Sequence, residues 1–347
     1  MVGRYWGLRM ADPKVSVLMS VFNGERYLRE AIDSILNQTF SNFEFVIIDD
    51  GSIDSSNEII RSYNDPRIRL IENEINIGLT KSLNKGIDDS QGKYIARMDA
   101  DDISLPERLE KQVNFMESNP EVGICGTLNR VLGVRDKGEK ILNYPKDHET
   151  ARCMLLFQNV FDHSTLMMSR KKLKKNQLRY DVSIKYAQDY DLISKASGMF
   201  KLANIQEVLL FSRKHSGQIR NKYGFMQKEV ARFIQKRYLS DLGIKPTKKE
   251  LDLHNNTITL CLPAGKETVL ETAKWLRKIK LANFRRNVYD QEILGGCISE
   301  LWLRVCNAYS ELGYWIWTMR SHFDFYGARK KRLFFELKFL GKCLLKY

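Results

Sequence analysis

Runs of apolar residues alternate with helical hydrophobic patterns along the first hundred residues. Residues 15–22 and 45–48 are apolar with little alternation, which is typical of strands in a parallel sheet. Each run is followed by a polar or glycine break and then by a helical pattern, at 31–36 and 57–60. A third apolar run covers residues 93–96. We therefore predict repeated strand–helix units that build a parallel sheet.

The pattern changes further along the chain. Residues 122–126 predict another strand, and helical patterns follow at Gln227 to Leu242, Lys266 to Lys280 and Gln291 to Tyr309, where Gly295-Gly296 interrupts the last without ending it. We predict four parts: an N-terminal extension at 1–12, a strand–helix half at 13–130, a half of mixed pattern at 131–220 and a helical region at 221–347.

Composition places the chain among ordinary globular proteins. It has 347 residues, of which 43% are hydrophobic and 11% aromatic, enough for one large domain and a smaller one. Six scattered cysteines without a CxxC pair predict reduced thiols in a cytoplasmic protein. The N-terminus has no signal-peptide pattern, and no stretch of about 20 apolar residues predicts a membrane span.

The net charge of +14 invites a nucleic-acid partner, but no nucleic-acid-binding module is visible, so we expect none. Basic residues concentrate at 170–175 and at 320–347, where eight basic and two acidic residues give +6. Leucines repeat in this tail at helical spacing: Leu333, Leu337, Leu340 and Leu344. This composition favours an interfacial helix on the anionic inner face of the cytoplasmic membrane. The alternative is an ordinary helix packed on the rest of the protein.

The densest group of acidic residues follows the third apolar run. Asp99, Asp101 and Asp102 lie within four residues. Carboxylates this close raise one another's pKa unless a cation neutralises them, so one interpretation is a divalent-cation site completed by a substrate phosphate. The other is an acidic turn or helix N-cap. Because ligands of parallel sheets lie beyond the carboxyl ends of strands, Asn23 and Asp50 are expected at the same rim.

An ordered series of motifs resembles the inverting family 2 glycosyltransferases, which have a nucleotide-sugar-binding GT-A fold. The matching residues are 13–17, 22–24, 36–40, 49–52, 76–84, 99–102 and 106–108, with weaker matches at 163–164, 188–192 and 213–218. The resemblance implies an α/β GT-A domain at 13–220, a mixed sheet flanked by helices, with a helical C-terminal extension. It also implies that 13–130 is the nucleotide-binding half of this domain and 131–220 the acceptor half. Since the motifs begin at Pro13, we expect Met10 to be the natural start.

The resemblance also implies roles around the acidic group. Asp101 stands at the position of the protein ligand to the metal, Mn²⁺ or Mg²⁺. Asp99 is expected to meet the ribose or a metal-bound water, and Asp102 to orient the site or the sugar. His215 matches a position where some relatives place a histidine near the metal and diphosphate, which makes it a second candidate ligand. The alternative for His215 is a surface or packing residue.

The nucleotide is expected to bind at the earlier motifs. Asp50 aligns with the position that typically hydrogen-bonds uracil, which favours a UDP-linked donor. Phe22 falls where the family usually carries tyrosine, so it can stack on the base but lacks the hydroxyl. Ser20 and Asn23 complete this candidate nucleotide-sugar site. Lys81 could approach a phosphate, or it could be a solvated surface lysine.

An inverting transferase needs one general base for the acceptor hydroxyl. Asp189 fits the family's base position, and Asp191 is its rival, while Gln188 stands where many relatives carry glutamate. The expected acceptor is a saccharide or lipid-linked saccharide, as in the synthesis of bacterial surface polysaccharides. Two other functions stay open: a catalytically inactive nucleotide-sugar-binding protein, and a sugar nucleotidyltransferase, although the glycine-rich phosphate loop expected of the latter is missing from residues 20–24.

Overall fold

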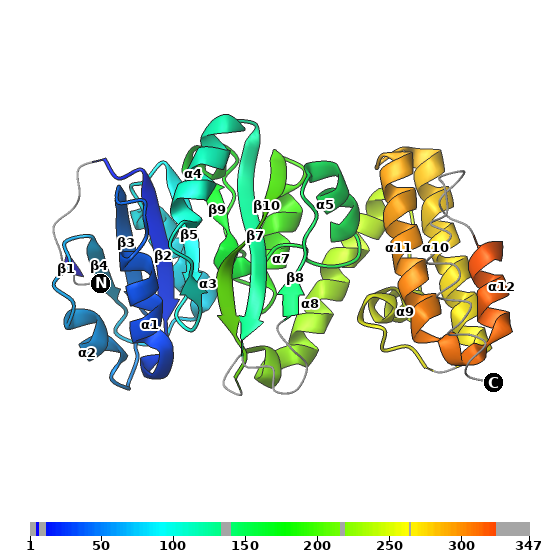
Figure 1. Ribbon diagram of the computed structural model, residues 1–347, viewed down its shortest axis with the longest axis horizontal. Coiled ribbons are helices and arrows are strands. Elements are labelled where there is room, and N and C mark those ends of the chain that lie inside the picture. Colours follow the sequence, from blue (N-terminus) through cyan, green and yellow to red (C-terminus); the bar gives the residue numbers. More distant parts are fainter. Residues whose placement is uncertain (1–4, 7–11, 133–139, 216–218, 264, 324–347) are drawn as a thin grey trace. The chain divides into compact units, whose positions relative to one another are not determined.

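The computed structural model describes residues 5–6, 12–132, 140–215, 219–263 and 265–323. The chain divides into two compact units (Figure 1). Unit 1 comprises residues 1–151 and 159–230, and unit 2 comprises residues 152–158 and 231–347. The chain therefore enters unit 2 briefly at 152–158, returns to unit 1, and enters unit 2 again after residue 230.

Unit 1 is built on one mixed sheet with the order β1-β4-β3-β2-β5-β9-β7-β10-β6, with β8 paired to β7. The strands are β1 (Tyr5–Trp6), β2 (Val15–Val21), β3 (Phe43–Asp49), β4 (Ile68–Glu72), β5 (Tyr94–Asp99), β6 (Ile103–Ser104), β7 (Val122–Leu132), β8 (Lys140–Leu142), β9 (Met167–Ser169) and β10 (Lys201–Arg213). The neighbours β4, β3, β2 and β5 are parallel, whereas β9 is antiparallel to both β5 and β7. The predicted strand–helix units are confirmed, and β1 adds an edge strand from within the predicted N-terminal extension.

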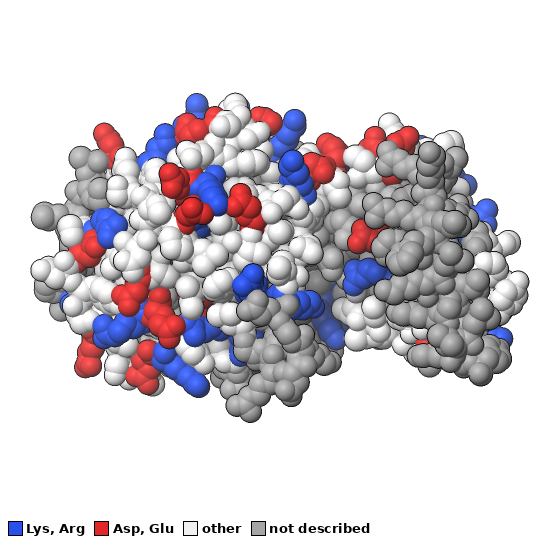
Figure 2. Space-filling view, viewed as in Figure 1, with Lys and Arg blue, Asp and Glu red and all other residues white. Residues whose placement is uncertain are grey.

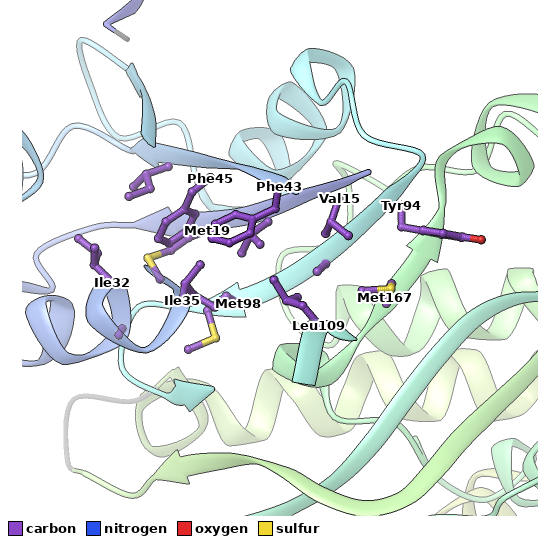
Figure 3. Packing of buried hydrophobic residues seen from close by; sticks show 14 of the residues in the cluster. Val15, Met19, Ile32, Ile35, Phe43, Phe45, Tyr94, Met98, Leu109 and Met167 are labelled. Carbon is purple, nitrogen blue, oxygen red and sulfur yellow. The ribbon is translucent and has the colours of Figure 1, made fainter. Parts of the chain in front are cut away.

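Helices flank this sheet. They are α1 (Glu25–Leu36), α2 (Ser56–Arg61), α3 (Leu79–Asp89), α4 (Arg108–Ser118), α5 (His148–Leu155), α6 (Arg170–Lys175) and α7 (Gln188–Ala196), with a 3₁₀ turn at His163–Thr165. Every residue of β2 and β3 is buried, which explains why their sequences show an apolar run without polar alternation. In Figure 3, Ile32 and Ile35 of α1 belong to the same buried cluster as Met19 of β2 and Phe43 and Phe45 of β3. This core fixes the strand ends that carry the polar motifs.

Unit 2 is helical. Its elements are the C-terminal part of α8 (Ile219–Asp241) from residue 231 on, α9 (Lys248–Thr259), α10 (Lys266–Arg286), α11 (Gln291–Ala308), a 3₁₀ turn at Ser310–Leu312 and α12 (Tyr314–His322). The three predicted helices are present, and α11 continues through Gly295-Gly296 as expected. The helical pattern missed α9, although Thr247 and Glu250 form a capping box that the sequence already displays.

The longer part of unit 2 begins after Val230, and residues 152–158 belong to unit 2 as well. α8 starts at Ile219, earlier than its apolar pattern indicated. No helix within the described residues is long and apolar enough to cross a membrane. On the face shown in Figure 2, the Lys and Arg side chains of the described residues lie among Asp and Glu side chains. Of the predicted interfacial tail at 320–347, residues 324–347 lie outside the described residues.

Candidate active site

Three neighbouring strands end at the same edge of the sheet and bring the sequence motifs together. In the strand register, Ser20 of β2 is opposite Asp99 of β5, and Val21 is opposite Asp49 of β3. The amide of Asp50 donates a hydrogen bond of 2.8 Å to the carbonyl of Val21. The rim predicted from the carboxyl ends of parallel strands is therefore present, although its residues come from segments up to 80 positions apart in the sequence.

Each of the two carboxylate oxygens of Asp99 has a partner. Its Oδ1 lies 2.5 Å from Nη2 of Arg97, a fully buried arginine on the same strand, and its Oδ2 accepts a hydrogen bond from the hydroxyl of Ser164. Burial alone would raise the pKa of Asp99, but the positive charge of Arg97 lowers it below its ordinary value. Asp99 is therefore a fixed anion whose two oxygens already have partners.

Asp101 and Asp102 share the small acidic space beside it. One carboxylate oxygen from each of Asp99, Asp101 and Asp102 lies within 4.8 Å of the others. Burial and the charge of Asp99 raise the pKa of Asp101, and the same two causes, with Asp101 added, raise that of Asp102 well above its ordinary value. Such mutual repulsion is relieved by a bound cation, and an all-oxygen set suits Mg²⁺ or Mn²⁺.

His215 closes this acidic group from the end of β10. Its Nε2 lies 2.8 Å from Oδ2 of Asp101, and its ring lies 4.8 Å from that of Tyr27 on α1. The neighbouring backbone takes part as well, because the amide of Arg213 donates to Oδ1 of Asp102 at 3.1 Å. Arg213 and His215 of the weak motif thus reach the acidic group, although they lie more than 100 positions from it in the sequence.

The turn after β2 is bonded to the turn after β3. Oδ1 of Asn23, whose φ is 53°, accepts from the amide of Ile53 at 2.9 Å, and the amide of Asn23 donates to the hydroxyl of Ser52 at 3.0 Å. Phe22, beside these turns, is 49% exposed, so one aromatic surface is available to a planar ligand. Asn23 thus has a structural role in joining the two turns.

Asp50 is buried and organises the loop that precedes α3. Its Oδ1 accepts from Nδ2 of Asn73 at 2.8 Å and from the amide of Ile77 at 3.0 Å, and its Oδ2 accepts from the amide of Gly78 at 2.9 Å. Lys81, on the first turn of α3, is exposed and lines a shallow depression with Lys85 and other α3 residues. The structure therefore places Lys81 near the start of α3 without a contact to the acidic group.

The two rival bases on α7 have different surroundings. Asp189 is a half-buried residue, and its Oδ2 accepts a hydrogen bond of 2.8 Å from Nδ2 of Asn159. Burial, with the charges of Asp162 and Asp99 adding to it, raises the pKa of Asp189 to about 6. Asp191 is fully buried, and its Oδ2 lies 2.7 Å from Nζ of Lys195.

Similar proteins identify the family of this chain. The family model described as "Glycosyl transferase family 2" matches residues 16–177. An uncharacterized glycosyltransferase of Haemophilus influenzae is 34% identical over 246 residues, which cover 67% of this chain and 76% of the relative. The chain belongs to glycosyl transferase family 2. As a member of this family it is a glycosyltransferase, and the resemblance inferred from the motifs is confirmed.

Other relatives of this glycosyltransferase have more specific names. The O-antigen biosynthesis glycosyltransferase WbnJ of Escherichia coli is 33% identical over 246 residues, which cover 67% of this chain and 94% of WbnJ. Among solved structures, S. aureus TarS 1–349 in complex with UDP-GlcNAc has a TM-score of 0.57 at 18% identity, covering 90% of this chain and 89% of that one. The mannosyltransferase PcManGT of Pyrobaculum calidifontis has a TM-score of 0.53 at 16% identity, covering 97% and 87%. These structures show that the glycosyltransferase has the GT-A fold.

Sequence reasoning missed several residues that support the site of this glycosyltransferase. Arg97 is a charged residue inside an apolar strand, two positions before Asp99 and hence on the same strand face, which was an available signal. Asp162 caps the 3₁₀ turn, and its Oδ1 accepts from the amide of Ser164 at 3.2 Å, an Asp-x-Ser pattern visible in the sequence. Asn159 carried no local signal, because its partner lies 30 positions away.

Proposed function

We propose that this glycosyltransferase is an inverting, metal-dependent enzyme that transfers a sugar from a UDP-linked donor to a saccharide or lipid-linked saccharide acceptor. The observation that carries the proposal is the cluster of Asp99, Asp101 and Asp102 at the carboxyl end of β5. Asp189 is a carboxylate outside this cluster. Its partial exposure and its raised pKa of about 6 suit a general base. The acidic cluster suits the stabilisation of the leaving diphosphate by a cation, and Asp189 suits the deprotonation of the acceptor hydroxyl.

In this proposal Asp101 is the main protein ligand of Mn²⁺ or Mg²⁺, and His215 is a second ligand. Arg97 and Ser164 hold Asp99 as an anion, which leaves it to orient the ribose or a metal-bound water. Asp102 is placed to orient the donor sugar or the site itself. When bound, the cation stabilises the negative charge that develops on the leaving diphosphate. The raised pKa values of Asp101 and Asp102 support a site that cation binding would stabilise.

The nucleotide lies at the turns after β2 and β3. Phe22 stacks on the base, and Oδ2 of Asp50 accepts the imide N–H of uracil beside its bond to Gly78, since each carboxylate oxygen has two lone pairs. Ser20 and Asn23 line the same rim, and Lys81 approaches a phosphate from the start of α3. The family position of Asp50 favours UDP, while thymine presents the same imide N–H as uracil.

Asp189 receives the proton of the acceptor hydroxyl. The acceptor oxygen then attacks the anomeric carbon on the face opposite the diphosphate, the bond to the diphosphate breaks, and the anomeric configuration inverts. Asp189 is preferred over Asp191 because Asp191 is fully buried beside Lys195, where no acceptor hydroxyl can reach it. Full burial of one carboxylate and partial exposure of the other thus distinguish the two candidates.

The comparisons support the substrate classes of this proposal. TarS was solved with UDP and with UDP-GlcNAc, and PcManGT with GDP-Man and Mn²⁺. WbnJ is named for O-antigen biosynthesis, and the Erwinia amylovora relative AmsE, 30% identical, for amylovoran biosynthesis. These names favour a nucleotide-sugar donor, a divalent metal and a role in cell-surface polysaccharide synthesis.

The test combines titration with turnover. We expect UDP to bind in the presence of Mn²⁺ or Mg²⁺. Binding of UDP in the presence of EDTA, and binding of GDP in the presence of the metal, should both be much weaker. A panel of UDP-sugars, assayed for slow hydrolysis, should contain at least one donor that is turned over. Asp101→Asn should reduce both metal-dependent UDP binding and turnover, the latter at least about 10²-fold, because a neutral amide is a poor ligand for a hard cation.

A matched control is Asp290→Asn, because Asp290 caps α11 and asparagine caps helices equally well. This variant should keep wild-type binding and turnover. A protein that binds UDP without hydrolysing any donor would favour the inactive binding protein, and one that forms UDP-sugar from UTP and a sugar phosphate would favour the nucleotidyltransferase. Near wild-type turnover of Asp101→Asn would overturn the metal assignment.

A further inference from the structure

The 3₁₀ turn His163–Thr165 of unit 1 adjoins the acidic group. Its middle residue, Ser164, donates its hydroxyl to Asp99. The residue after the turn is held as well, because the amide of Arg97 on β5 donates to the carbonyl of Leu166 at 2.8 Å. The turn is therefore fixed beside the carboxyl end of β5, where the acidic group lies.

One ring nitrogen of His163, the first residue of this turn, already has a partner. Its Nε2 lies 2.7 Å from the hydroxyl of Tyr180, and the two rings pack edge-on with their centroids 5.6 Å apart. Tyr180 is buried, and its backbone is held in both directions by Asn84 on α3. Oδ1 of Asn84 accepts from the Tyr180 amide at 3.1 Å, and Nδ2 donates to the Tyr180 carbonyl at 2.8 Å. Tyr180 is thus a fixed partner that sets the orientation of the imidazole ring.

The other ring nitrogen of His163, Nδ1, has no hydrogen-bond partner within the described residues. His163 is half-buried, and Nδ1 is not one of the fully buried polar atoms that lack a partner, so it remains accessible to a ligand. Burial and the charge of Arg97 lower the pKa of His163 to about 3, which keeps the ring neutral at physiological pH. A neutral imidazole with one accessible nitrogen suits an uncharged polar group such as a hydroxyl.

The pair of His163 and Tyr180 lies near both groups that the reaction needs. The charges of Asp189 and Asp99 add to burial in raising the pKa of Tyr180, so both carboxylates are close enough to act on this side chain. In an inverting reaction the transferred sugar lies between the metal-bound diphosphate and the base, because the acceptor attacks on the face opposite the leaving group. A ligand group in this space belongs to the sugar, and the nucleotide lies elsewhere on the rim.

We propose that His163 hydrogen-bonds through Nδ1 to a hydroxyl or acetamido group of the transferred sugar and so helps to select the donor. The inference rests on the proposed function, because it takes the sugar to lie between the acidic group and Asp189. Tyr180 is the positioning residue that holds the ring for this contact. A site that hydrogen-bonds one substituent discriminates against donors that lack it, since such a donor leaves the nitrogen covered and unpaired.

The test compares a ligand that contains the sugar with one that lacks it, in the full-length protein. The readouts are kcat/KM for hydrolysis of a UDP-sugar that the wild type turns over, and the Kd of UDP with Mn²⁺ by calorimetry. His163→Phe keeps a planar ring and removes both nitrogens. It should lower kcat/KM about 10-fold and leave the Kd of UDP within about twofold, because UDP carries no sugar.

Two amide variants distinguish the two ring nitrogens. The side-chain amide of asparagine reaches about as far as Nδ1, and that of glutamine about as far as Nε2. His163→Asn should therefore keep kcat/KM within about threefold of the wild type, whereas His163→Gln should lose about as much as His163→Phe. A deoxy-sugar donor that lacks the recognised group should be hydrolysed equally slowly by the wild type and by His163→Phe, since the contact is already absent.

A pair of tyrosine variants separates positioning from general stability. Tyr180→Phe should lower kcat/KM about threefold and leave UDP binding unchanged, because the imidazole loses the partner that orients it. Tyr94→Phe is the matched control. Tyr94 is also a buried tyrosine of unit 1, but its hydroxyl donates to Oε1 of Glu117 at 3.0 Å, at the start of β5 and away from the acidic group. Its replacement should leave both readouts unchanged.

Each failure has a distinct signature. Unchanged kcat/KM of His163→Phe on every UDP-sugar would overturn the contact, and equal losses in UDP binding and in kcat/KM would show a structural role instead. Better retention of activity by His163→Gln than by His163→Asn would overturn the assignment to Nδ1, and this pair supplies the test if His163→Phe does not fold. A wild-type protein that binds no UDP, or hydrolyses no donor, would overturn the proposed function and with it this inference.

Discussion

Asp189 and Asp191 illustrate how two identical residues on one helix acquire different chemistry. Asp189 is partly exposed at the start of α7 and accepts a bond from Asn159, whereas Asp191 is fully buried against Lys195. The sequence placed both in a family motif but could not orient them, because their directions depend on where the helix begins. α7 begins at Gln188, after Ala187 in the left-handed conformation. That backbone detail, set by tertiary packing, separates the two roles.

The raised pKa of Asp189 predicts the pH dependence of turnover. A general base must be ionised, so kcat/KM should fall tenfold per pH unit as the pH drops below about 6 and should be level above it. Asp189→Asn should lower kcat about 10²-fold or more, with little change in UDP affinity. Rate measurements from pH 5 to 8 test both statements. A base assignment to Asp189 would be untenable if Asp191→Asn produced the large loss and Asp189→Asn did not.

The same pKa predicts opposite stability effects for the two replacements. The folded-state pKa of about 6 exceeds the ordinary value of 3.8, so the folded protein binds the proton more tightly and loses stability as the pH rises from about 4 to 6. Asp189→Asn removes this cost and should stabilise the protein at pH 7 by about 1–3 kcal/mol, an advantage that disappears near pH 4. Asp191→Asn breaks a buried ion pair and should destabilise it by a similar amount. Urea denaturation at pH 4 and pH 7 distinguishes them, and a loss of stability in Asp189→Asn at pH 7 would contradict the linkage.

At the scale of elements, the turn after β3 depends on one glycine. Gly51 has φ of +73°, and a Cβ there would lie 2.6 Å from the carbonyl carbon of Ile75 and 2.7 Å from the amide nitrogen of Asn76. Gly51→Ala should therefore cost about 1–3 kcal/mol of stability and weaken UDP binding, since Asp50 and its loop must move. Thermal unfolding and calorimetry measure the two effects. Gly296→Ala, at an uncrowded site within α11, should instead be neutral or slightly stabilising, and equal behaviour of the two variants would refute the steric argument.

Local patterns predicted the regular elements of the nucleotide-binding half well. β2 and β3 are buried throughout and mostly apolar because helices cover both faces of the sheet, and α1 shows the helical spacing of its buried side. The gathering of Asn23, Asp50 and Asp99 also followed from the topology of parallel strands. What could not be predicted was the partner of each side chain, such as Ser164 for Asp99, because such contacts depend on distant segments. α9 was missed for a different reason, since a capping box present in the sequence was not given weight.

At the scale of the whole molecule, the sequence does not reveal that residues 152–158 belong to unit 2. Residues 152–158 read as part of an ordinary helix and loop, and nothing local distinguishes them from their neighbours. Their assignment to unit 2 depends on contacts with His254 and Gln235, about 80 to 100 positions later. Sequence periodicity contains no information on contacts at this separation. The membership of residues 152–158 in unit 2 therefore emerges only from the folded chain.

The last prediction concerns residues 324–347, which lie outside the described residues and carry a net charge of +5 in the sequence. If this tail binds the membrane as its composition indicates, each Lys or Arg near an anionic surface contributes about 1 kcal/mol and the leucine and phenylalanine side chains insert shallowly. Sedimentation should then show binding to vesicles rich in anionic lipid, little binding to neutral vesicles, and partial release by salt. Deleting residues 324–347 keeps α12, which ends at His322, and should abolish vesicle binding while preserving hydrolysis of a UDP-sugar. Neutralising the exposed lysines of the other basic run, Lys171, Lys174 and Lys175 on α6, should leave vesicle binding unchanged. Vesicle binding that survives the deletion, or is lost with the α6 lysines, would place the membrane-binding surface elsewhere.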